Sequence, residues 1–195
     1  MTQTLATLYV VCGKIAAGKT TLARKLAAEH GAALICEDEW LVRLEADINS
    51  FDDFVVQARR LRAALGPHVI ELLRLGLSVV LDVPGNTVKS RIWVRSLFEA
   101  ASARHELHWI DAPDEVCRAR LRVRNETKPE GLYFGHVPEA IFDPVNRAIT
   151  PPAQSEGFNV VWHRHPAAEA PAHVPALSPP RRRSARKSRA PNPKQ

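Results

Sequence analysis

A glycine-rich stretch near the N-terminus has the residue types and spacing that bind a polyphosphate. It runs from Gly13 to Thr20 and has the pattern G-x-x-x-x-G-K-T. Its glycines allow successive backbone N–H groups to point inward, and a helix beginning at Lys19 adds its positive dipole end. Lys19 can reach the β- and γ-phosphates, and the Thr20 hydroxyl can coordinate Mg²⁺. We therefore expect a nucleotide to be bound by Gly13, Ala16, Ala17, Gly18, Lys19, Thr20 and Thr21, with Lys19 also catalytic.

The segments on either side of this motif favour a phosphate-binding loop over an ordinary glycine-rich turn. The apolar run Leu8–Cys12 before it is typical of a buried strand. The run Thr21–Glu29 after it has helical composition. A strand, a glycine-rich loop and a helix in this order form the setting in which the motif binds phosphates.

Carboxylates follow two further apolar runs. The run 32–36 predicts a short buried strand that ends in Glu37-Asp38-Glu39, and the run 77–81 ends in Asp82. Parallel α/β sheets bind ligands at the carboxyl ends of their strands. Asp38 is the candidate general base or ligand of a substrate hydroxyl, and Glu37 and Glu39 compete for that role. Alternatively, the acidic cluster caps a helix beginning at Trp40, which is the interpretation we favour for Glu39.

The second strand end suggests further candidates. Asp82 is expected to act through Mg²⁺ or its water shell, although an aspartate shortly before Pro84 can also simply form a turn. Asn86 and Arg91, together with Glu37, are candidate substrate-binding residues. For Arg91, a solvated position is an equal alternative.

Four arginines alternate along a predicted helix that runs from about 113 to 124. At 100° per residue, Arg120 and Arg124 fall within the apolar arc, whereas Arg118 and Arg122 fall on the solvated face. Arginines that point inward need an anion, so we predict that Arg120 and Arg124 neutralise the transferring phosphoryl group. The alternative is a structural pair with a carboxylate or carbonyl of the fold.

Strand-like and helix-like segments alternate over residues 1–165. Helices are predicted over 50–65, over 67–75 after a break at Gly66-Pro67, and over 88–103. Further strands are predicted at 107–111 and 158–162. This alternation predicts a three-layer α/β fold, with a five-stranded, mostly parallel sheet and helices on both faces.

The net charge of +6 is concentrated in the last 30 residues. Residues 166–195 contain seven basic side chains and one acidic one, so the preceding 165 residues are neutral overall. The same segment is rich in proline and serine, and we predict a disordered tail. Such a tail can contact nucleic acid, but more often it only keeps a protein soluble.

Composition excludes several other classes of protein. No apolar run reaches the roughly 20 residues that span a bilayer, and the N-terminus has no secretion signal, so we expect a cytoplasmic protein without a membrane partner. Cys12, Cys36 and Cys117 lie in apolar surroundings and have no C-x-x-C spacing. We expect them to be buried, reduced thiols.

Four stretches together resemble the small P-loop kinases usually labelled AAA-family ATPases. These are the phosphate loop, the acidic strand end at 37–41, the Asp82…Asn86…Arg91 stretch and the helix that carries Arg120 and Arg124. That group is similar to polynucleotide 5′-hydroxyl kinases, zeta-toxin-like kinases, chloramphenicol phosphotransferase and gluconate kinase. The resemblance covers about residues 5–165. It implies the P-loop NTPase fold, ATP and Mg²⁺ as cofactors, Asp38 at the acceptor hydroxyl and the two arginines at ATP.

The resemblance favours a phosphotransferase that moves the γ-phosphate of ATP to a hydroxyl of a small molecule or nucleotide. The alternative is a nucleic-acid-associated ATP-binding protein or ATPase, including a polynucleotide 5′-hydroxyl kinase, that uses the basic tail. Polynucleotide kinases place an arginine three residues after the acid, where this chain has Leu41. The N-K-x-D motif of guanine-specific proteins is also missing from the sequence.

Overall fold

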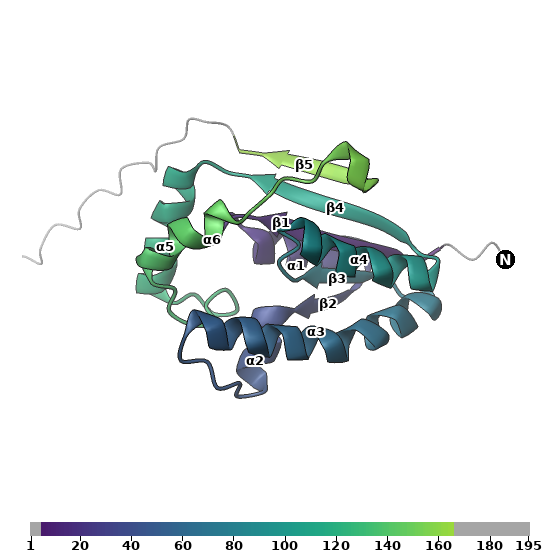
Figure 1. Ribbon diagram of the computed structural model, residues 1–195, viewed down its shortest axis with the longest axis horizontal. Helices are drawn as coiled ribbons and strands as arrows, with labels where there is room; N and C mark the ends of the chain where they lie inside the picture. The colour runs from purple at the N-terminus through teal and green to yellow at the C-terminus, as the bar shows by residue number, and fades with distance from the viewer. Residues whose placement is uncertain (1–4, 166–195) are drawn as a thin grey trace, which may run out of the picture.

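Five parallel strands form the sheet at the centre of the computed structural model, which describes residues 5–165. The strand order is β2-β3-β1-β4-β5, seen from the bottom to the top of Figure 1. The predicted sheet is therefore confirmed, and every strand pair in it is parallel. The strands are β1 (Thr7–Gly13), β2 (Ala33–Cys36), β3 (Val79–Asp82), β4 (Arg104–Asp111) and β5 (Val160–Arg164).

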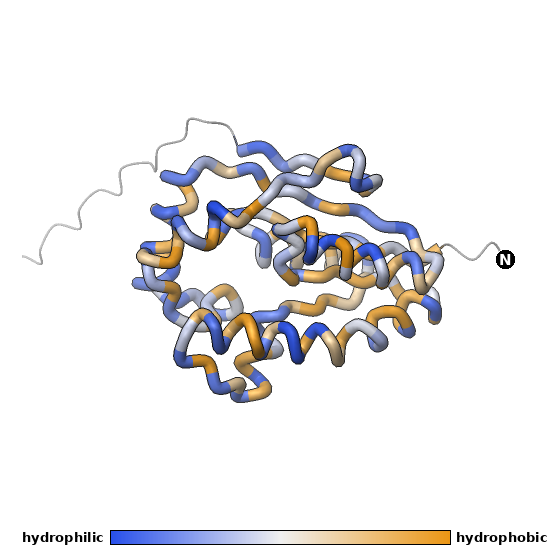
Figure 2. The backbone as a smooth tube through the Cα atoms, viewed as in Figure 1, coloured by the Kyte–Doolittle hydropathy of each residue, from blue (hydrophilic) through white to orange (hydrophobic). Residues whose placement is uncertain are grey.

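Helices cover both faces of the sheet, because the inner strands are apolar on both sides. In β1, Leu8 and Val10 face one layer, whereas Tyr9 and Val11 face the other. The first layer contains α3 (Phe51–Arg74) and α4 (Val88–Ala101), and the second contains α1 (Lys19–His30) and α5 (Asp114–Thr127). Figure 2 shows the resulting hydrophobic stretches along the central strands.

The predicted helix break at Gly66-Pro67 is wrong, because α3 is one continuous helix. Pro67 and Ala63, whose carbonyl loses its helical hydrogen bond to position 67, are both exposed, so water can satisfy that carbonyl. At Gly66, an added Cβ would lie 3.6 Å from Leu97 of α4, which is an ordinary van der Waals contact, so α3 packs directly on α4 at this point. Burial of one apolar stripe, worth ~1.5–3 kcal/mol per side chain, outweighs the proline cost of ~3 kcal/mol. That stripe consists of Leu61, Leu65, Val69 and Leu73.

Other element ends differ from the prediction by a few residues. The helix α2 (Glu37–Arg43) begins directly after β2, at Glu37, whereas the prediction placed its start at Trp40. Glu39 forms an ion pair with Arg43 at 2.6 Å, one turn later in the same helix. The strand β4 begins three residues earlier than predicted.

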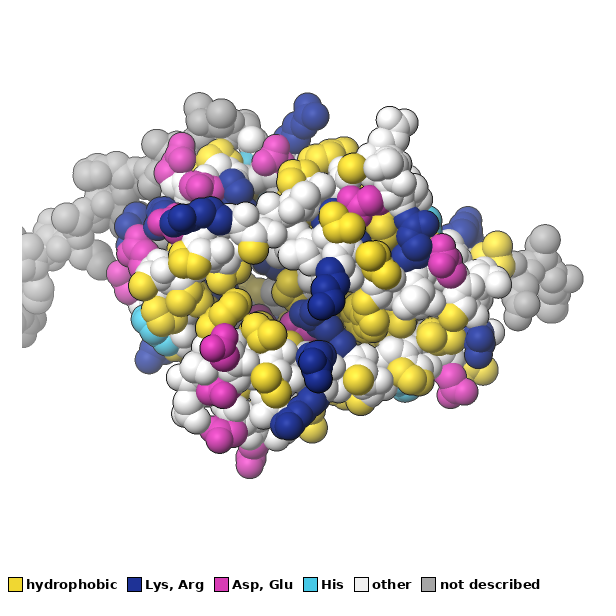
Figure 3. Space-filling model, in the orientation of Figure 1, with side chains coloured by type: hydrophobic (Ala, Val, Ile, Leu, Met, Phe, Trp, Pro, Cys, Tyr) yellow, Lys and Arg dark blue, Asp and Glu magenta, His cyan; other side chains and the backbone are white. Residues whose placement is uncertain are grey.

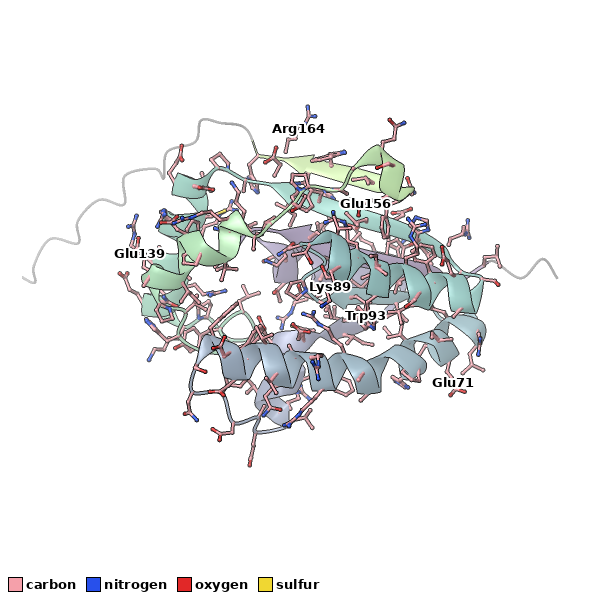
Figure 4. The ribbon with its side chains drawn as sticks, viewed as in Figure 1. Glu71, Lys89, Trp93, Glu139, Glu156 and Arg164 are labelled. Carbon is pink, nitrogen blue, oxygen red and sulfur yellow. The ribbon has the colours of Figure 1, made fainter. Side chains whose placement is uncertain are left out.

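The chain after α5 returns across the end of the sheet through short elements: η1 (Glu139–Ile141), α6 (Phe142–Arg147) and η2 (Gln154–Glu156). Arg118 of α5 forms ion pairs with Asp143 and Glu139 and lies over the ring of Phe142. The prediction that Arg118 lies on a solvated face is therefore wrong, because its side chain attaches this segment to α5. Glu139 is labelled beside α5 in Figure 4.

The predicted basic tail, 166–195, lies outside the described residues. Within residues 5–165, none of the helices is long and apolar enough to cross a membrane.

Candidate active site

The phosphate loop has the conformation that its motif predicts. Gly13 and Gly18 have φ angles of +143° and +106°, which side-chain-bearing residues rarely adopt. A Cβ on Gly13 would also lie 2.8 Å from the carbonyl oxygen of Ile110, in the neighbouring strand β4. The helix α1 begins at Lys19, so its N-terminal dipole points at the loop. The loop and the helix together form an anion-binding site.

Most of the predicted nucleotide-binding residues line one large cleft of about 1490 Å³ at the carboxyl ends of the strands. Those that do are Ala16, Gly18, Lys19, Thr20 and Thr21. Gly13 and Ala17 are buried members of the loop and do not line the cleft. Figure 3 shows the cleft as a hollow bordered by hydrophobic side chains.

Asn86 holds the start of the phosphate loop in place. The Gly13 N–H donates to Asn86 Oδ1 at 2.8 Å, and Asn86 Nδ2 donates to the Gly13 carbonyl oxygen at 3.0 Å. Both polar groups of this amide are thus used by the loop. Asn86 lines the cleft, but the structure assigns it to positioning the loop, where the sequence had suggested substrate binding.

A second amide, which sequence reasoning missed, supports the loop two residues further on, at Ile15. The Ile15 N–H donates to Asn146 Oδ1, in α6, at 3.2 Å. Asn146 belongs to no recognisable motif, and it reaches the loop only because the chain folds back after α5. Nothing in the local sequence signals this contact.

Lys19 lines the cleft, and its ammonium group bonds back to the phosphate loop. Its Nζ donates to the carbonyl oxygens of Lys14 at 2.8 Å and Gly13 at 3.1 Å. Burial lowers the pKa of Lys19, whereas the nearby carboxylates of Asp82 and Asp38 raise it. The cation therefore stands between the loop and two acidic side chains.

Asp82 ends β3, Asp38 lies just beyond the end of the neighbouring strand β2, and both line the same cleft. Asp82 is the last residue of β3, pairs in register with Cys36 of β2, and accepts a hydrogen bond from the Cys36 thiol at 3.5 Å. Asp38 lies in the first turn of α2, directly after β2. Strand pairing thus places at one edge of the sheet two carboxylates that are 44 positions apart in the chain.

Asp38 has an unusual electrostatic environment. Its side chain opens into the cleft, but the surrounding walls and the carboxylates of Asp82 and Glu37 raise its pKa from 3.8 to about 6. Burial is the largest cause, and Lys19 and Arg124 act in the opposite direction. A carboxylate with this pKa is a stronger base than an ordinary aspartate and is still largely ionised at neutral pH.

Glu37, the residue before Asp38, is buried and paired with an arginine of α3. Its side chain is 1% exposed and accepts hydrogen bonds from Arg62 Nε at 2.5 Å and Nη2 at 2.8 Å. Successive helical residues point about 100° apart, so Glu37 turns into the protein while Asp38 turns into the cleft. Glu37 does not line the cleft, which corrects its prediction as a substrate-binding residue.

Arg120 and Arg124 both line the cleft, on the side of the phosphate loop. Arg120 Nη1 donates to the carbonyl oxygen of Ala17 at 3.2 Å. Within residues 5–165, the buried Nε of Arg124 has no hydrogen-bond partner, and burial lowers the pKa of this guanidinium. An unpartnered buried donor on a cation is costly, so the position fits an anionic ligand.

The structure places Arg91 in the interior, which corrects the prediction that it is either a substrate ligand or solvated. The side chain is fully buried and forms a bidentate ion pair with Glu156, with Nε–Oε2 and Nη2–Oε1 distances of 2.6 and 2.7 Å. It also donates to the carbonyl oxygens of Gly85 and Thr150. Arg91 thus attaches α4 to the returning chain, where Figure 4 labels Glu156.

The cleft also contains oxygen groups that fit Mg²⁺. The Thr20 hydroxyl and the Asp82 carboxylate both line it, one at the N-terminus of α1 and the other at the end of β3. Hard oxygen ligands of this kind, supplemented by phosphate oxygens and water, are what Mg²⁺ takes in nucleotide sites. The residues present therefore fit the ion that the resemblance implies.

Comparison with solved structures shows the same fold in several proteins. Kti12 from Chaetomium thermophilum, solved with ADP-AlF3, has a TM-score of 0.62 and 18% identity, with 80% of this chain and 88% of that chain covered. The APS kinase CysC from Mycobacterium tuberculosis, solved with AMPPNP and APS, has a TM-score of 0.54 and 17% identity, covering 84% and 90%. A gluconokinase from Sinorhizobium meliloti has a TM-score of 0.54 and 17% identity, covering 82% and 83%.

Two further comparisons concern sequence alone. No curated protein matches the chain. The family model described as an AAA domain matches residues 8–152, which include the phosphate loop, both strand-end carboxylates and the arginine-bearing helix. The chain therefore belongs to the AAA domain family and has the three-layer fold of the P-loop kinases.

Proposed function

We propose that this protein is an ATP- and Mg²⁺-dependent phosphotransferase that acts on a hydroxyl of a small molecule or nucleotide. The observation that carries the proposal is the position of Asp38, a carboxylate with a raised pKa in the same cleft as the phosphate loop. An ATPase needs the loop but has no need of a base for an alcohol. Transfer to a hydroxyl needs both.

The cleft residues divide the reaction between them. The loop N–H groups and Lys19 hold the phosphates, and Arg124, with Arg120 beside it, faces the γ-phosphate. Thr20 and Asp82 would hold Mg²⁺, which neutralises charge on the phosphate oxygens. Asp38 accepts the proton of the acceptor hydroxyl as that oxygen bonds to phosphorus and the bond from the γ-phosphorus to the bridging oxygen of ADP breaks. The products are the phosphorylated alcohol, ADP and protonated Asp38, which returns its proton to solvent.

The solved structures named above support this proposal because proteins with the same fold are named as kinases or were solved with nucleotides. Gluconokinase and APS kinase are named for transfer to an acceptor, and the APS kinase was solved with a nucleotide and APS together. Kti12 was solved with ADP-AlF3. All three share the fold at 17–18% identity, so they leave the acceptor of the present protein open.

We also propose the cytoplasm as the compartment and residues 1–165 as the catalytic unit, with 166–195 as a separate basic tail. Support for the compartment comes from Cys12, Cys36 and Cys117, which are free and buried. Support for the boundary is the shift to a proline- and arginine-rich composition after His165.

The direct experiment supplies the protein with ATP, Mg²⁺ and a panel of alcohols, and follows both ADP and new phosphate esters by ³¹P NMR. We expect an ester with at least one alcohol, and we expect Asp38→Asn to lower its rate of formation by about 100-fold or more while ATP still binds. If the protein only hydrolyses ATP, at a rate that Asp38→Asn leaves unchanged, the phosphotransferase proposal is wrong.

A further inference from the structure

Part of the cleft that also contains Asp38 is lined by large apolar side chains. We call it the acceptor wall and define it by apolar residues that line the cleft and come from the residues just before α3, the start of α3 and the segment after α6: Ile48, Phe51, Phe54, Val55 and Ile149. Three of them are unusually open for apolar residues, since Ile48, Phe51 and Val55 are 37%, 48% and 49% exposed. Large apolar side chains gathered on a concave surface indicate a binding site.

The fold ties the acceptor wall to Asp38. Arg62 of α3 binds Glu37, which directly precedes Asp38. Val55 lies seven residues before Arg62, on the same face of α3 and about 10 Å further along its axis. Phe54 and Ile149 both pack against the same core cluster. An acceptor with its hydroxyl at Asp38 therefore has its remaining atoms against this wall.

Polar side chains in this half of the cleft are already engaged with their own chain. Ser50 caps α3 by accepting from the Asp53 N–H and also donates to the Asp53 carboxylate. Thr87 and Ser90 form the capping box of α4. Arg62 is neutralised by Glu37. An acceptor rich in hydroxyl or carboxylate groups would lose water here without gaining matching partners, which costs free energy.

We propose that the acceptor is a small alcohol that carries its hydroxyl on a compact apolar body of aromatic or alicyclic type. This proposal rests on the proposed phosphotransferase function and narrows its substrate class. Polyols, sugar acids and nucleotides are disfavoured, because their polar groups would face the acceptor wall. The apolar body gains by leaving water, and the single hydroxyl is directed to Asp38.

Substrate competition tests the proposal directly. The value of kcat/KM is measured for 2-phenylethanol and cyclohexylmethanol, and compared with glycerol, gluconate and adenosine under the same ATP and Mg²⁺. We expect the two apolar alcohols to exceed the polar acceptors by at least about tenfold, which is the discrimination that one or two buried methylene groups provide. A preference for glycerol, gluconate or adenosine would overturn the acceptor wall while leaving the phosphotransferase function intact.

A matched pair of variants locates the effect on the wall. Val55 and Val56 are neighbours in α3 with 49% and 48% exposure, but only Val55 lines the cleft. We expect Val55→Asp to raise the KM for 2-phenylethanol by about tenfold or more, because a carboxylate replaces apolar surface. The KM for ATP should stay unchanged, and Val56→Asp should leave both values unchanged. Equal effects of the two substitutions would refute the wall.

A fluorescent probe provides a readout that does not depend on catalysis. The fluorescence emission of 1-anilinonaphthalene-8-sulfonate increases when this dye binds to an apolar protein surface. We expect part of this emission to disappear in Val55→Asp and to persist in Val56→Asp, and 2-phenylethanol should compete for that part. If it does so although no alcohol is phosphorylated, the wall stands and the proposed function fails; if emission is the same in both variants, the wall is refuted.

Discussion

The donor and acceptor halves of the cleft are built in different ways. The donor half consists mainly of backbone N–H groups and Lys19 from one run of eight residues, 13–20, at the start of α1. The acceptor half consists of side chains from α2, α3 and the segment after α6, as distant in the chain as Asp38 and Ile149. A contiguous loop binds the ligand part that all nucleotides share, whereas scattered side chains can change the acceptor without disturbing that loop.

The substitution with the largest expected effect disrupts the donor half alone. Lys19→Ala removes the cation that faces the phosphates, and we expect ATP affinity to fall by at least about 100-fold, or ~2.7 kcal/mol. The fold should survive, because within residues 5–165 the hydrogen bonds of the Lys19 ammonium group go to carbonyl oxygens of its own loop. Titration with a fluorescent ATP analogue measures the affinity, and Lys89→Ala, at an exposed position on α4, is the control. Unchanged ATP affinity in Lys19→Ala would overturn the nucleotide site.

The second largest effect is that of pH, which should change the reaction of the acceptor through Asp38 without a matching change in ATP binding. Because the pKa of Asp38 is raised to about 6, we expect kcat/KM for the acceptor to rise from pH 5 to pH 7 and to level off above it. ATP affinity, which depends on the donor half, should not follow this profile. A profile measured at saturating ATP tests the point, and an acceptor rate that does not change between pH 5 and 7 would contradict a base with this pKa.

The same shift has a consequence for stability, with the opposite sign to that of a salt-bridged aspartate. The pKa of Asp38 is higher in the folded state than its unfolded value of 3.8, so its ionisation opposes folding above pH 6. That cost shrinks as the pH falls below 6 and is lost only below pH 3.8, where the carboxyl is protonated in both states. Urea unfolding at pH 7.5 and pH 4 should therefore show that Asp38→Asn gains much more stability over wild type at pH 7.5 than at pH 4.

Loss of the buried ion pair in the acceptor half should lower the stability of the protein more than it changes ATP binding. Glu37→Gln removes the bidentate partner of Arg62, and we expect the free energy of unfolding to fall by about 3 kcal/mol. In the folded fraction, ATP affinity should change by less than about twofold, because no residue of the loop 13–20 forms a hydrogen bond or ion pair with Glu37 or Arg62 within residues 5–165. Chemical denaturation measures the first effect. The control is Glu39→Gln, which breaks a more exposed pair with Arg43 and should cost at most about 0.5 kcal/mol.

The smallest expected effect concerns a side chain of the donor half. Asn86→Ala removes the two hydrogen bonds to Gly13 and should lower the free energy of unfolding by about 1–2 kcal/mol. Because the loop loses its support, the KM for ATP should rise severalfold, while the KM for the acceptor should stay the same. The opposite pattern, a changed acceptor KM with an unchanged ATP KM, would return Asn86 to the substrate-binding role that its sequence position suggests.

Much of the fold and of the donor half follows from local sequence. The phosphate loop, the apolar strands and the alternation of strands with helices are properties of contiguous residues, so a one-dimensional pattern contains them. The helical projection also placed Arg120 and Arg124 on the inner face of α5, and both line the cleft. Their roles at the γ-phosphate stay predictions, because projection reports direction and not the ligand.

The errors concern residues whose environment is made by distant parts of the chain. The Gly66-Pro67 pair indicated a helix end, but the packing of α3 against α4 maintains one continuous helix. Arg91 was a candidate for substrate contact or solvation, but Glu156, which is 65 residues away, holds it in the interior. Local propensity is worth only a few kcal/mol, so tertiary packing of this size overrides it.

The adjacent residues Glu37 and Asp38 show most clearly what each level of structure decides. The sequence by itself determined that a strand ends in carboxylates beside a phosphate loop, because strand and loop patterns are local. It could not determine which carboxylate faces the ligand, since that depends on Arg62, which lies 25 residues away and pairs with Glu37. Tertiary structure alone made that choice, and it left Asp38 with a raised pKa, facing the cleft beside the acceptor wall.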